Sequence, residues 1–309
     1  MKRVNGIRNL RSKVRKPVLA VGVFDGVHRG HQRIIREVVR EAKRIGGTSV
    51  IMTFDPHPLK LLYRKAHAPL ITSLEHRINL IGDLDVDICL VINFNNKFSR
   101  ISADDFIKKV LLQALGIECL VIGESFRFGR KKRGSLALLR ELSREHKFHI
   151  HKVKPFKVNG KIISSSKIRQ FIKNGELSRA KVFLGREFSI LGRVVPGRAR
   201  GRILGFPTAN ITPHQEIVPL SGVYAVRVKL NKRVLPGILN IGKRPTFENK
   251  KDAYPTIETH IFNFHNNIYG KKLEIFFVKR IRPEKRFYSP EALRAQIARD
   301  QHKAKSILK

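Results

Sequence analysis

Cysteine is scarce in this sequence, which contains two in 309 residues, Cys89 and Cys119. Each lies within a short apolar run, residues 88–92 and residues 119–122, of the kind that forms a core strand. Two such cysteines exclude the disulfide framework of a small secreted domain. They predict reduced core thiols in a cytoplasmic protein.

Long hydrophobic runs are also absent. No uninterrupted apolar stretch approaches the roughly 20 residues that a membrane-spanning helix needs, although hydrophobic residues make up 42% of the chain and suffice for sizeable cores. Residues 1–16 are basic but lack the apolar segment of a signal peptide. We therefore expect neither a membrane protein nor an exported one.

Acidic residues are few, because 24 Asp and Glu stand against 63 Lys and Arg, a formal net charge of +39. Such a charge favours anionic ligands and weak, salt-sensitive contact with nucleic acid. The excess is spread over both halves of the chain, with local concentrations at residues 2–16 and 127–133. A dedicated nucleic-acid binder more often has one basic tail or stripe, so we expect small-molecule substrates and no dedicated nucleic-acid partner. A nucleic-acid-binding protein on a degenerate enzyme scaffold stays open as an alternative.

The length of 309 residues favours two domains. In the first, residues 1–185, strand-like and helix-like patterns alternate, which is typical of a parallel sheet with helices on both faces. We expect a Rossmann-like α/β domain whose ligands bind beyond the carboxyl ends of the strands. The strand candidates are residues 18–24, 48–54, 87–93, 118–123 and 149–153, and the helix candidates are residues 32–44, 74–82, 103–115 and 135–146.

The second predicted domain, residues 186–309, contains short β-rich runs with weak helical periodicity before residues 290–308. This pattern favours a small antiparallel β-barrel followed by a C-terminal helix. Residues 173–185 predict two short helical pieces at the junction. The strand candidates are residues 189–195, 223–230, 234–240, 256–262 and 273–280.

The turn after the first predicted strand carries His28 and His31, three residues apart where a helix begins. Their side chains can share one helix face, and a helix N-terminus offers unpaired N–H groups and a partial positive charge to a phosphate. Gly30 between them lets the backbone approach closely. The pattern predicts nucleotidyl or phosphoryl transfer, and the alternative is a histidine pair that simply caps the helix.

A second anion site is predicted where Ser164, Ser165 and Ser166 run into a helix that carries Lys167 and Arg169. Paired with the histidine turn across a sheet edge, it would hold a triphosphate from the other side. Serines at a helix start are also ordinary N-caps, so the residues alone leave both interpretations open.

Two further loops follow predicted strands. Residues 55–58, Asp-Pro-His-Pro, form a stiff turn that either binds a ligand or is only a rigid loop. Residues 123–129 place Phe126, Arg127 and Phe128 between two glycines, where a ring can stack on a planar ligand and the arginine can contact phosphate. Alternatively, the two phenylalanines anchor this loop to the core.

In the second half, Thr208 and Asn210 alternate along an extended chain within residues 201–210, so that their oxygens face one side. Hydroxyl and amide oxygens are hard ligands suited to Mg²⁺ that carries nucleotide phosphates. Downstream, Glu258 lies in an apolar strand pattern. A lone strand carboxylate is usually solvated, but beside a metal-bound phosphate it would take a proton from an attacking hydroxyl.

These motifs, in this order and over nearly the whole chain, resemble the family of bifunctional bacterial riboflavin kinase/FMN adenylyltransferases, also called FAD synthetases. The N-terminal half carries GVFDGVHRGHQ, TFDPHP, GESFRFG and ISSSKIR. The C-terminal half carries GRVVPGRARGRILGFPTANI, GVYAV, NIGKRPTF, ETHIFNF and YGKKLEIFF.

The resemblance implies two activities. A barrel kinase would phosphorylate the 5′-hydroxyl of riboflavin to make FMN, and the N-terminal nucleotidyltransferase would join FMN and ATP into FAD with release of pyrophosphate. Riboflavin, FMN and ATP would be the substrates, with Mg²⁺ as the metal cofactor. No covalent intermediate is needed, because the phosphate of FMN is already a competent nucleophile.

The resemblance also implies the residues at each site. His28, His31 and Arg169 would act in adenylyl transfer, and Glu258 would be the general base of the kinase. Mg²⁺ would be bound by Thr208 and Asn210. The residues in contact with ATP would be Gly22, Phe24, Asp25, His28, His31, Ser164, Ser165, Arg169, Gly205, Thr208 and Asn210. Those in contact with the flavin would be Phe54, Pro56, His57, Ser125, Phe126, Phe128, Phe206 and Glu258.

Ser125 departs from the family pattern, which commonly has Asp or Asn at this position. A riboflavin kinase with a weak adenylyltransferase half is therefore the alternative among enzymes. Ser166 stands where the family commonly has Thr and keeps the hydroxyl.

Overall fold

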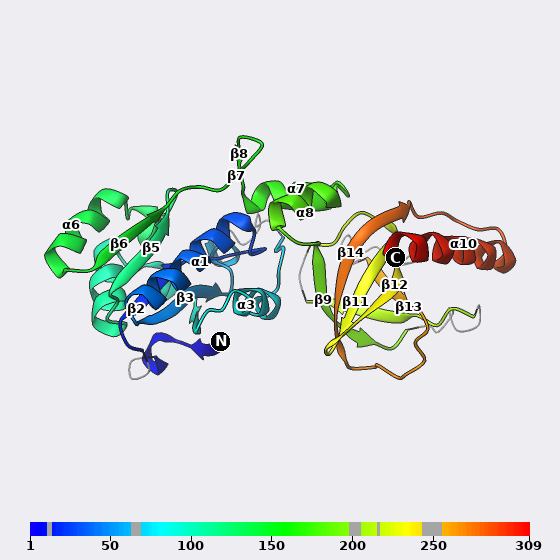
Figure 1. Cartoon of the computed structure of the whole chain (residues 1–309), viewed down its shortest axis with the longest axis horizontal. Coiled ribbons are helices and arrows are strands. Elements are labelled where there is room, and N and C mark those ends of the chain that lie inside the picture. Colours follow the sequence, from blue (N-terminus) through cyan, green and yellow to red (C-terminus); the bar gives the residue numbers. More distant parts are fainter. Residues whose placement is uncertain (11–13, 63–68, 198–204, 215–216, 243–254) are drawn as a thin grey trace. The chain divides into compact units, whose positions relative to one another are not determined.

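The computed structural model describes residues 1–10, 14–62, 69–197, 205–214, 217–242 and 255–309. The chain forms two compact units (Figure 1). The first comprises Met1–Ala68 and Leu74–Ser165, and the second comprises Pro69–Ser73 and Ser166–Lys309. Residues 201–204 of the Thr208 motif and residues 243–247 of the NIGKRPTF motif lie outside the described part. The expected boundary between residues 185 and 186 stays a prediction.

The first unit contains a sheet in the strand order β1-β4-β3-β2-β5-β6. All neighbouring strands in it are parallel, which confirms the α/β prediction. Because β2 pairs with β3 on one side and β5 on the other, the strand order reverses there, and ligands bind at such a reversal. The strands are β1 Lys2–Asn5, β2 Pro17–Val21, β3 Thr48–Asp55, β4 Ile88–Asn93, β5 Cys119–Gly123 and β6 His149–Val153, followed by a hairpin of β7 Lys157–Val158 and β8 Lys161–Ile162.

Helices cover both faces of this sheet. They are α1 Arg29–Arg44, α2 Pro58–Leu62, α3 Leu74–Gly82, α4 Asn96–Ser99, α5 Ala103–Asp105, the π-helix Phe106–Ala114 and α6 Leu136–His146, with 3-10 turns at Ile7–Asn9 and Arg130–Lys132. Successive strand residues point to opposite faces. Val18 and Ala20 of β2 therefore pack with α1 and α3, whereas Leu19 between them packs with the π-helix and α6.

Several elements of this unit differ from the sequence expectation. α2, α4 and the β7–β8 hairpin were not expected, and the helix expected over residues 103–115 forms α5 and the π-helix. β2 ends at Val21 instead of residue 24, because Phe24 has a left-handed backbone with φ of 54°. α1 begins at Arg29, three residues early, because His28 caps it. The edge strand β1 escaped prediction, since its short basic sequence has no apolar alternation.

The two cysteines lie where the sequence placed them. Cys89 on β4 and Cys119 on β5 are buried and unpaired. Burial raises the pKa of each thiol to about 11. Both thiols are therefore protonated core groups at neutral pH, and neither is a reactive thiolate.

The second unit contains a closed barrel in the strand order β10-β13-β12-β11-β14-β9. Its neighbouring strands pair antiparallel, which confirms the predicted barrel. β10 was expected from the sequence only as an extended chain. The strands are β9 Ser189–Val195, β10 Ala209–Pro213, β11 Gly222–Leu230, β12 Arg233–Gly242, β13 Thr256–Ile261 and β14 Lys272–Arg282.

The C-terminal helix α10 (Pro290–Leu308) begins and ends at the predicted residues and lies against this barrel (Figure 1). Its Ala304 belongs to a buried cluster with Val223 and Ile238 of the barrel. Before the barrel, α7 (Ser165–Lys173) and α8 (Leu177–Leu184) form the junction. Residues 173–185 thus hold one complete helix, not the two pieces expected. Within the described ranges, every helix is too short or too polar to cross a membrane.

Candidate active sites

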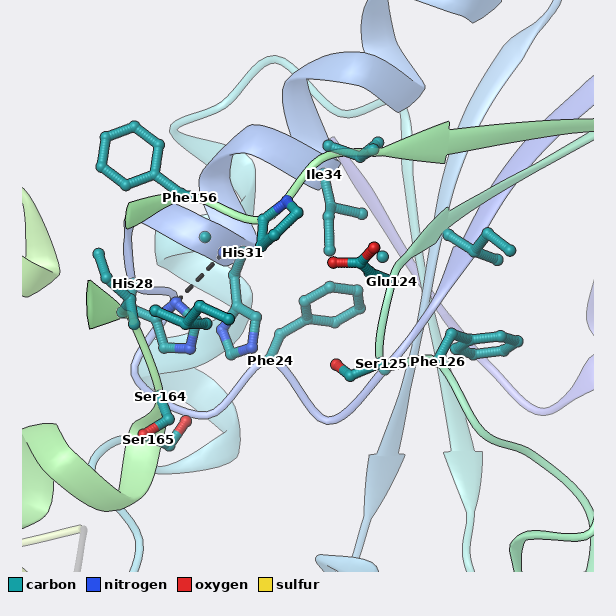
Figure 2. Close-up of a pocket in the computed structure, with 18 of the residues that line it drawn as sticks. Phe24, His28, His31, Ile34, Glu124, Ser125, Phe126, Phe156, Ser164 and Ser165 are labelled. Atoms are coloured by element: carbon teal, nitrogen blue, oxygen red, sulfur yellow. Dashed lines mark hydrogen bonds between the residues drawn. The ribbon is translucent and has the colours of Figure 1, made fainter. Parts of the chain in front are cut away.

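A cavity of about 550 Å³ opens at the carboxyl ends of β2, β5 and β6 in the first unit (Figure 2). It lies at the reversal of strand order, where the sequence analysis placed the ligand. Much of the expected adenylyltransferase site is brought together here. The expected residues that line the cavity are Gly22, Phe24, His28, His31, Ser125, Phe126, Ser164 and Ser165.

The turn that carries the histidines has a constrained backbone. Phe24, Gly26 and Val27 have φ of 54°, 79° and 37°, all in the left-handed region. The chain then enters α1, and Nδ1 of His28 accepts a hydrogen bond from the backbone N–H of His31 at 3.3 Å. His28 is therefore the N-cap of α1, and this capping role places it on the cavity wall.

The imidazole rings of His28 and His31 stack, with centroids 3.5 Å apart and an interplanar angle of 18°. A Cβ at Gly30 would lie 3.2 Å from the ring of His28, so glycine leaves room for the pair. Burial, His28 and Arg77 together hold the pKa of His31 well below its ordinary value, and its ring is neutral at pH 7. Within the described part of the chain, its buried Nδ1 has no hydrogen-bond partner, which leaves that atom available to a ligand.

Arg77 of α3 is a contributor that the sequence analysis missed. Its side chain is 2% exposed. Nη1 donates to the carbonyl oxygen of Val23 at 2.9 Å, and Nη2 donates to that of Phe54 at 3.0 Å. Val23 begins the histidine turn and Phe54 lies at the end of β3. No sequence signal marks this residue, because most arginines on amphipathic helices are exposed.

The serine motif contacts the backbone of the histidine turn. Ser164 and Ser165 line the cavity, and the hydroxyl of Ser165 donates to the carbonyl oxygen of Asp25 at 3.0 Å. Arg169 belongs to the second unit, where its Nε donates to the carbonyl oxygen of Pro69 at 2.8 Å. Its contact with ATP phosphates stays a prediction.

The aromatic residues expected to bind the flavin fall into two groups. Phe126 lines the cavity and stacks on Phe128, with ring centroids 5.4 Å apart. Phe128 itself is buried in the core beneath the sheet. Phe54 is buried in the same cluster, with its ring edge-on to Phe94 at 5.5 Å. Phe54 and Phe128 thus both pack in the core, and the flavin contacts expected of them stay predictions.

The stiff turn after β3 has its own internal support. Pro56 follows a cis peptide bond. His57 is buried, and its Nδ1 accepts a hydrogen bond from the backbone N–H of Leu59 at 3.0 Å. His57 therefore supports the start of α2, and its role as a flavin contact stays a prediction.

In the barrel, strand register brings the kinase candidates together. Asn210 of β10 lies opposite Glu258 of β13, and Glu258 in turn lies opposite Asn240 of β12. Residues in register on antiparallel strands project from the same face of a sheet. The three polar residues thus form one row across three strands. Asn240 was not singled out from the sequence, because only the register shows that it neighbours Glu258.

A second cavity, of about 530 Å³, lies within this unit and is lined by Thr208, Asn210 and Thr259 together with residues 264–269. The amide of Asn210 lies so close to Gly197 that a Cβ on that glycine would overlap it. Oγ1 of Thr259 is buried and, among the residues that the structure describes, has no hydrogen-bond partner. Its hydroxyl is therefore a further polar group available at the cavity wall.

His260 of β13 secures the segment that leads into Thr208. Its Nδ1 lies 2.7 Å from the carbonyl oxygen of Pro207, and since a carbonyl only accepts, this nitrogen carries the proton. The ring of His260 is also edge-on to Phe206, at 5.9 Å between centroids. Gly205 precedes them with a left-handed φ of 85°. His260 follows Glu258 closely in the sequence motif, but its contact with the carbonyl oxygen of Pro207, 53 residues away, could not be predicted from the sequence.

Comparison with known proteins matches each half of the chain. Family models for FAD synthetase and for riboflavin kinase match residues 10–167 and residues 184–308. Three curated relatives are called bifunctional riboflavin kinase/FMN adenylyltransferase. That of Buchnera aphidicola subsp. Schizaphis graminum is 38% identical, over 97% of this chain and 96% of the relative. That of Escherichia coli K12 is 36% identical, over 99% and 98%. That of Bacillus subtilis 168 is 38% identical, over 94% and 92%.

A solved structure agrees in fold over the same extent. The crystal structure of a protein described as a macrolide-efflux protein from Streptococcus pneumoniae has a TM-score of 0.83 and 26% sequence identity, and the match covers 98% of each chain. The family models and the near full-length relatives therefore establish that the chain belongs to the family of bifunctional riboflavin kinase/FMN adenylyltransferases.

Proposed function

We propose that the cavity of the first unit is where the adenylyl group of ATP is joined to FMN. The observation that carries this assignment is the stacked pair of His28 and His31 at the N-terminus of α1, on the cavity wall. As a member of its family, the chain makes FMN from riboflavin and ATP, and then FAD from FMN and ATP with release of pyrophosphate.

In adenylyl transfer, an oxygen of the FMN phosphate forms a bond to the α-phosphorus of ATP while the bond to pyrophosphate breaks. Negative charge builds up on the phosphate oxygens, and fixed donors aimed at that charge lower the barrier. The imidazoles of His28 and His31 and the first N–H groups of α1 supply such donors. Ser164 and Ser165 hold the triphosphate, and Phe126 and Ser125 contact the flavin.

In the kinase reaction, the 5′-hydroxyl of riboflavin forms a bond to the γ-phosphorus of ATP, and ADP leaves. Glu258 takes the proton from the attacking hydroxyl as general base. Its place opposite Asn210 in the β10–β13 ladder supports this role, because it sets the base beside a residue proposed to hold the metal and its phosphates.

The donor set at the second cavity fits Mg²⁺. The Thr208 hydroxyl and the Asn210 amide oxygen are both neutral oxygen ligands on the cavity wall, and Mg²⁺ is usually bound by a few protein oxygens together with substrate phosphates. When bound, the ion neutralises phosphate charge during transfer. Thr208 and Asn210 would orient it, and the lack of a Cβ at Gly197 leaves room for the Asn210 amide.

We assign adenylyl transfer to residues 1–185 and the kinase to residues 186–309, an assignment supported by family-model limits at residues 167 and 184. We also propose that the enzyme acts in the cytoplasm, because thiols such as the unpaired Cys89 and Cys119 stay reduced there. Its basic surface attracts anionic substrates, and the proposal needs no nucleic-acid partner.

A chromatographic time course tests both assignments. Purified protein is incubated with ATP, Mg²⁺ and riboflavin, and in parallel with ATP, Mg²⁺ and FMN. We expect riboflavin to pass through FMN to FAD, and FMN to be converted directly. Addition of EDTA stops the kinase step. Accumulation that ends at FMN would support the weak-adenylyltransferase alternative, and no conversion from either substrate would contradict the proposal and favour the nucleic-acid alternative.

A further inference from the structure

The chains of β2 and β3 separate next to the adenylyltransferase cavity. Within the described residues, the last backbone hydrogen bond between these two chains runs from the N–H of Gly22 to the carbonyl oxygen of Met52, at 3.0 Å. Beyond it, one chain enters the histidine turn and the other enters the turn at Asp55. The backbone carbonyls past this point need donors from elsewhere, because they no longer belong to a ladder.

Arg77 supplies those donors and joins the two chains again. Its guanidinium reaches the carbonyl oxygen of Val23 at 2.9 Å and that of Phe54 at 3.0 Å. The hydroxyl of Thr53 also donates to the carbonyl oxygen of Val23, at 3.1 Å. A planar guanidinium holds its N–H groups in a fixed fork, so Nη1 and Nη2 each donate to one of the two carbonyls.

The two turns that Arg77 bridges also carry acidic residues that influence its charge. Burial lowers the pKa of Arg77, and the nearby charge of Asp25 is the chief influence that opposes this, with a further contribution from Asp55. Asp25 lies in the histidine turn and is 2% exposed, while Asp55 ends β3. The two carboxylates that raise the pKa of Arg77 thus come one from each chain that it bridges.

We propose that Arg77 is a positioning residue for adenylyl transfer, which fixes the turn that presents His28 and His31 to the cavity by bridging the carbonyls of Val23 and Phe54. The inference rests on the proposed function of this cavity. Arg77 acts through the backbone of the turn. A misplacement of catalytic groups by about 1 Å can cost about 100-fold in rate, so a local anchor of this kind has a measurable effect.

The test compares Arg77→Met, Arg77→Lys and a control, Asn79→Met, which places the same new side chain at an exposed position of the same helix. The kcat and KM of FMN-to-FAD conversion are measured, and the riboflavin kinase rate of the same preparation serves as an internal standard. Urea unfolding reports whether each variant is folded.

We expect Arg77→Met to lower the kcat of adenylyl transfer about 10-fold to 100-fold, with the KM for ATP and FMN changed by less than about threefold. Arg77→Lys falls between Arg77→Met and the parent, because an ammonium group keeps the positive charge but lacks the fixed fork of the guanidinium. Asn79→Met matches the parent, and the kinase rate is unchanged in all three variants.

A spectroscopic measurement separates positioning from a loss of stability. Two titratable groups, His28 and Arg77, lower the pKa of His31 in addition to burial. Removal of the cation in a folded Arg77→Met protein therefore raises the pKa of His31, which is followed by NMR titration of the histidine rings. Partial unfolding alone would instead reduce the intensity of the native signals without moving them.

A folded Arg77→Met protein whose kcat stays within about threefold of the parent would overturn the inference. If Arg77→Met does not fold, Arg77→Lys decides, and full kcat in that variant overturns it. Failure of the proposed function looks different, because then the parent makes no FAD from FMN, or the His28→Ala/His31→Ala variant keeps the full rate.

Discussion

The two candidate sites are held by different kinds of backbone. In the first unit, His28 and His31 follow a turn with three residues in the left-handed region, and that turn is secured by a cap, a glycine and a buried arginine. In the second unit, Asn210 and Glu258 lie on paired strands of a closed barrel. A ladder fixes the spacing of its own residues, whereas a turn depends on anchors supplied from elsewhere in the fold.

This difference predicts where each site is vulnerable. The turn-built site should be sensitive to residues that never touch substrate, such as Arg77. The strand-built site should be sensitive at its rim, where the segment around Thr208 meets the ladder. Four substitutions probe the contrast, and in each case the activity of the other unit is the control.

The largest effect is expected from Gly197→Ala at the rim of the strand-built site. A Cβ at this position would overlap the amide of Asn210, so the amide must move away from its place opposite Glu258. We expect kcat/KM of the kinase to fall about 100-fold, while FMN-to-FAD conversion in the same sample is unchanged. An unaltered kinase would show that Asn210 has no fixed role.

A smaller loss is expected from His260→Ala, which removes the donor to the carbonyl oxygen of Pro207. The segment before Thr208 then loses one anchor, and we expect the KM for MgATP to rise about 10-fold, with a lesser change in kcat. His260→Asn keeps an N–H donor and should recover part of the loss. Equal kinetics in the alanine and asparagine variants would contradict this anchoring role.

Gly30→Ala has two opposing effects at the turn-built site, one on stability and one on the position of the His28 ring. Alanine favours a helix over glycine by about 1 kcal/mol, but its Cβ would lie 3.2 Å from the ring of His28. We expect unchanged or slightly higher stability in urea and about threefold to 10-fold slower adenylyl transfer. A variant that is both stabilised and fully active would show that the ring stack tolerates displacement.

The smallest effect is expected from Thr259→Val, which removes a buried hydroxyl that lacks a partner within the described ranges. Removal of a buried hydroxyl without a hydrogen-bond partner breaks no bond and relieves a desolvation cost, so stability is unchanged or raised. If the hydroxyl contacts a substrate in the second cavity, the KM for ATP or riboflavin rises about threefold. Unchanged KM values for both substrates would remove Thr259 from the site.

The sequence predicted the parts of the molecule that depend on local pattern. Alternating strands and helices predicted the parallel sheet, and short apolar runs predicted the barrel. His28, His31, Thr208 and Asn210 stood out because their spacing puts each pair of side chains on one side of a predicted helix start or extended chain. The structure brings the two histidines together in one cavity and places Thr208 and Asn210 on the wall of another.

The remainder depends on contacts between residues far apart in the chain. Arg77 lies 54 residues from Val23 in sequence, and a lone arginine on a helix carries no sign of burial. Asn240 was identified as a neighbour of Glu258 only from the strand register that sets the two residues opposite each other. Phe128 fitted a stacking role and a core role equally well until its burial was known.

The central claim is that adenylyl transfer and riboflavin phosphorylation depend on different residues, and reciprocal loss of activity tests it most directly. The rates of riboflavin-to-FMN and FMN-to-FAD conversion are measured in Glu258→Ala and in His28→Ala/His31→Ala. We predict that Glu258→Ala loses FMN formation and keeps FMN-to-FAD conversion, while the double histidine variant does the reverse. A folded variant of either kind that loses both activities would contradict the account.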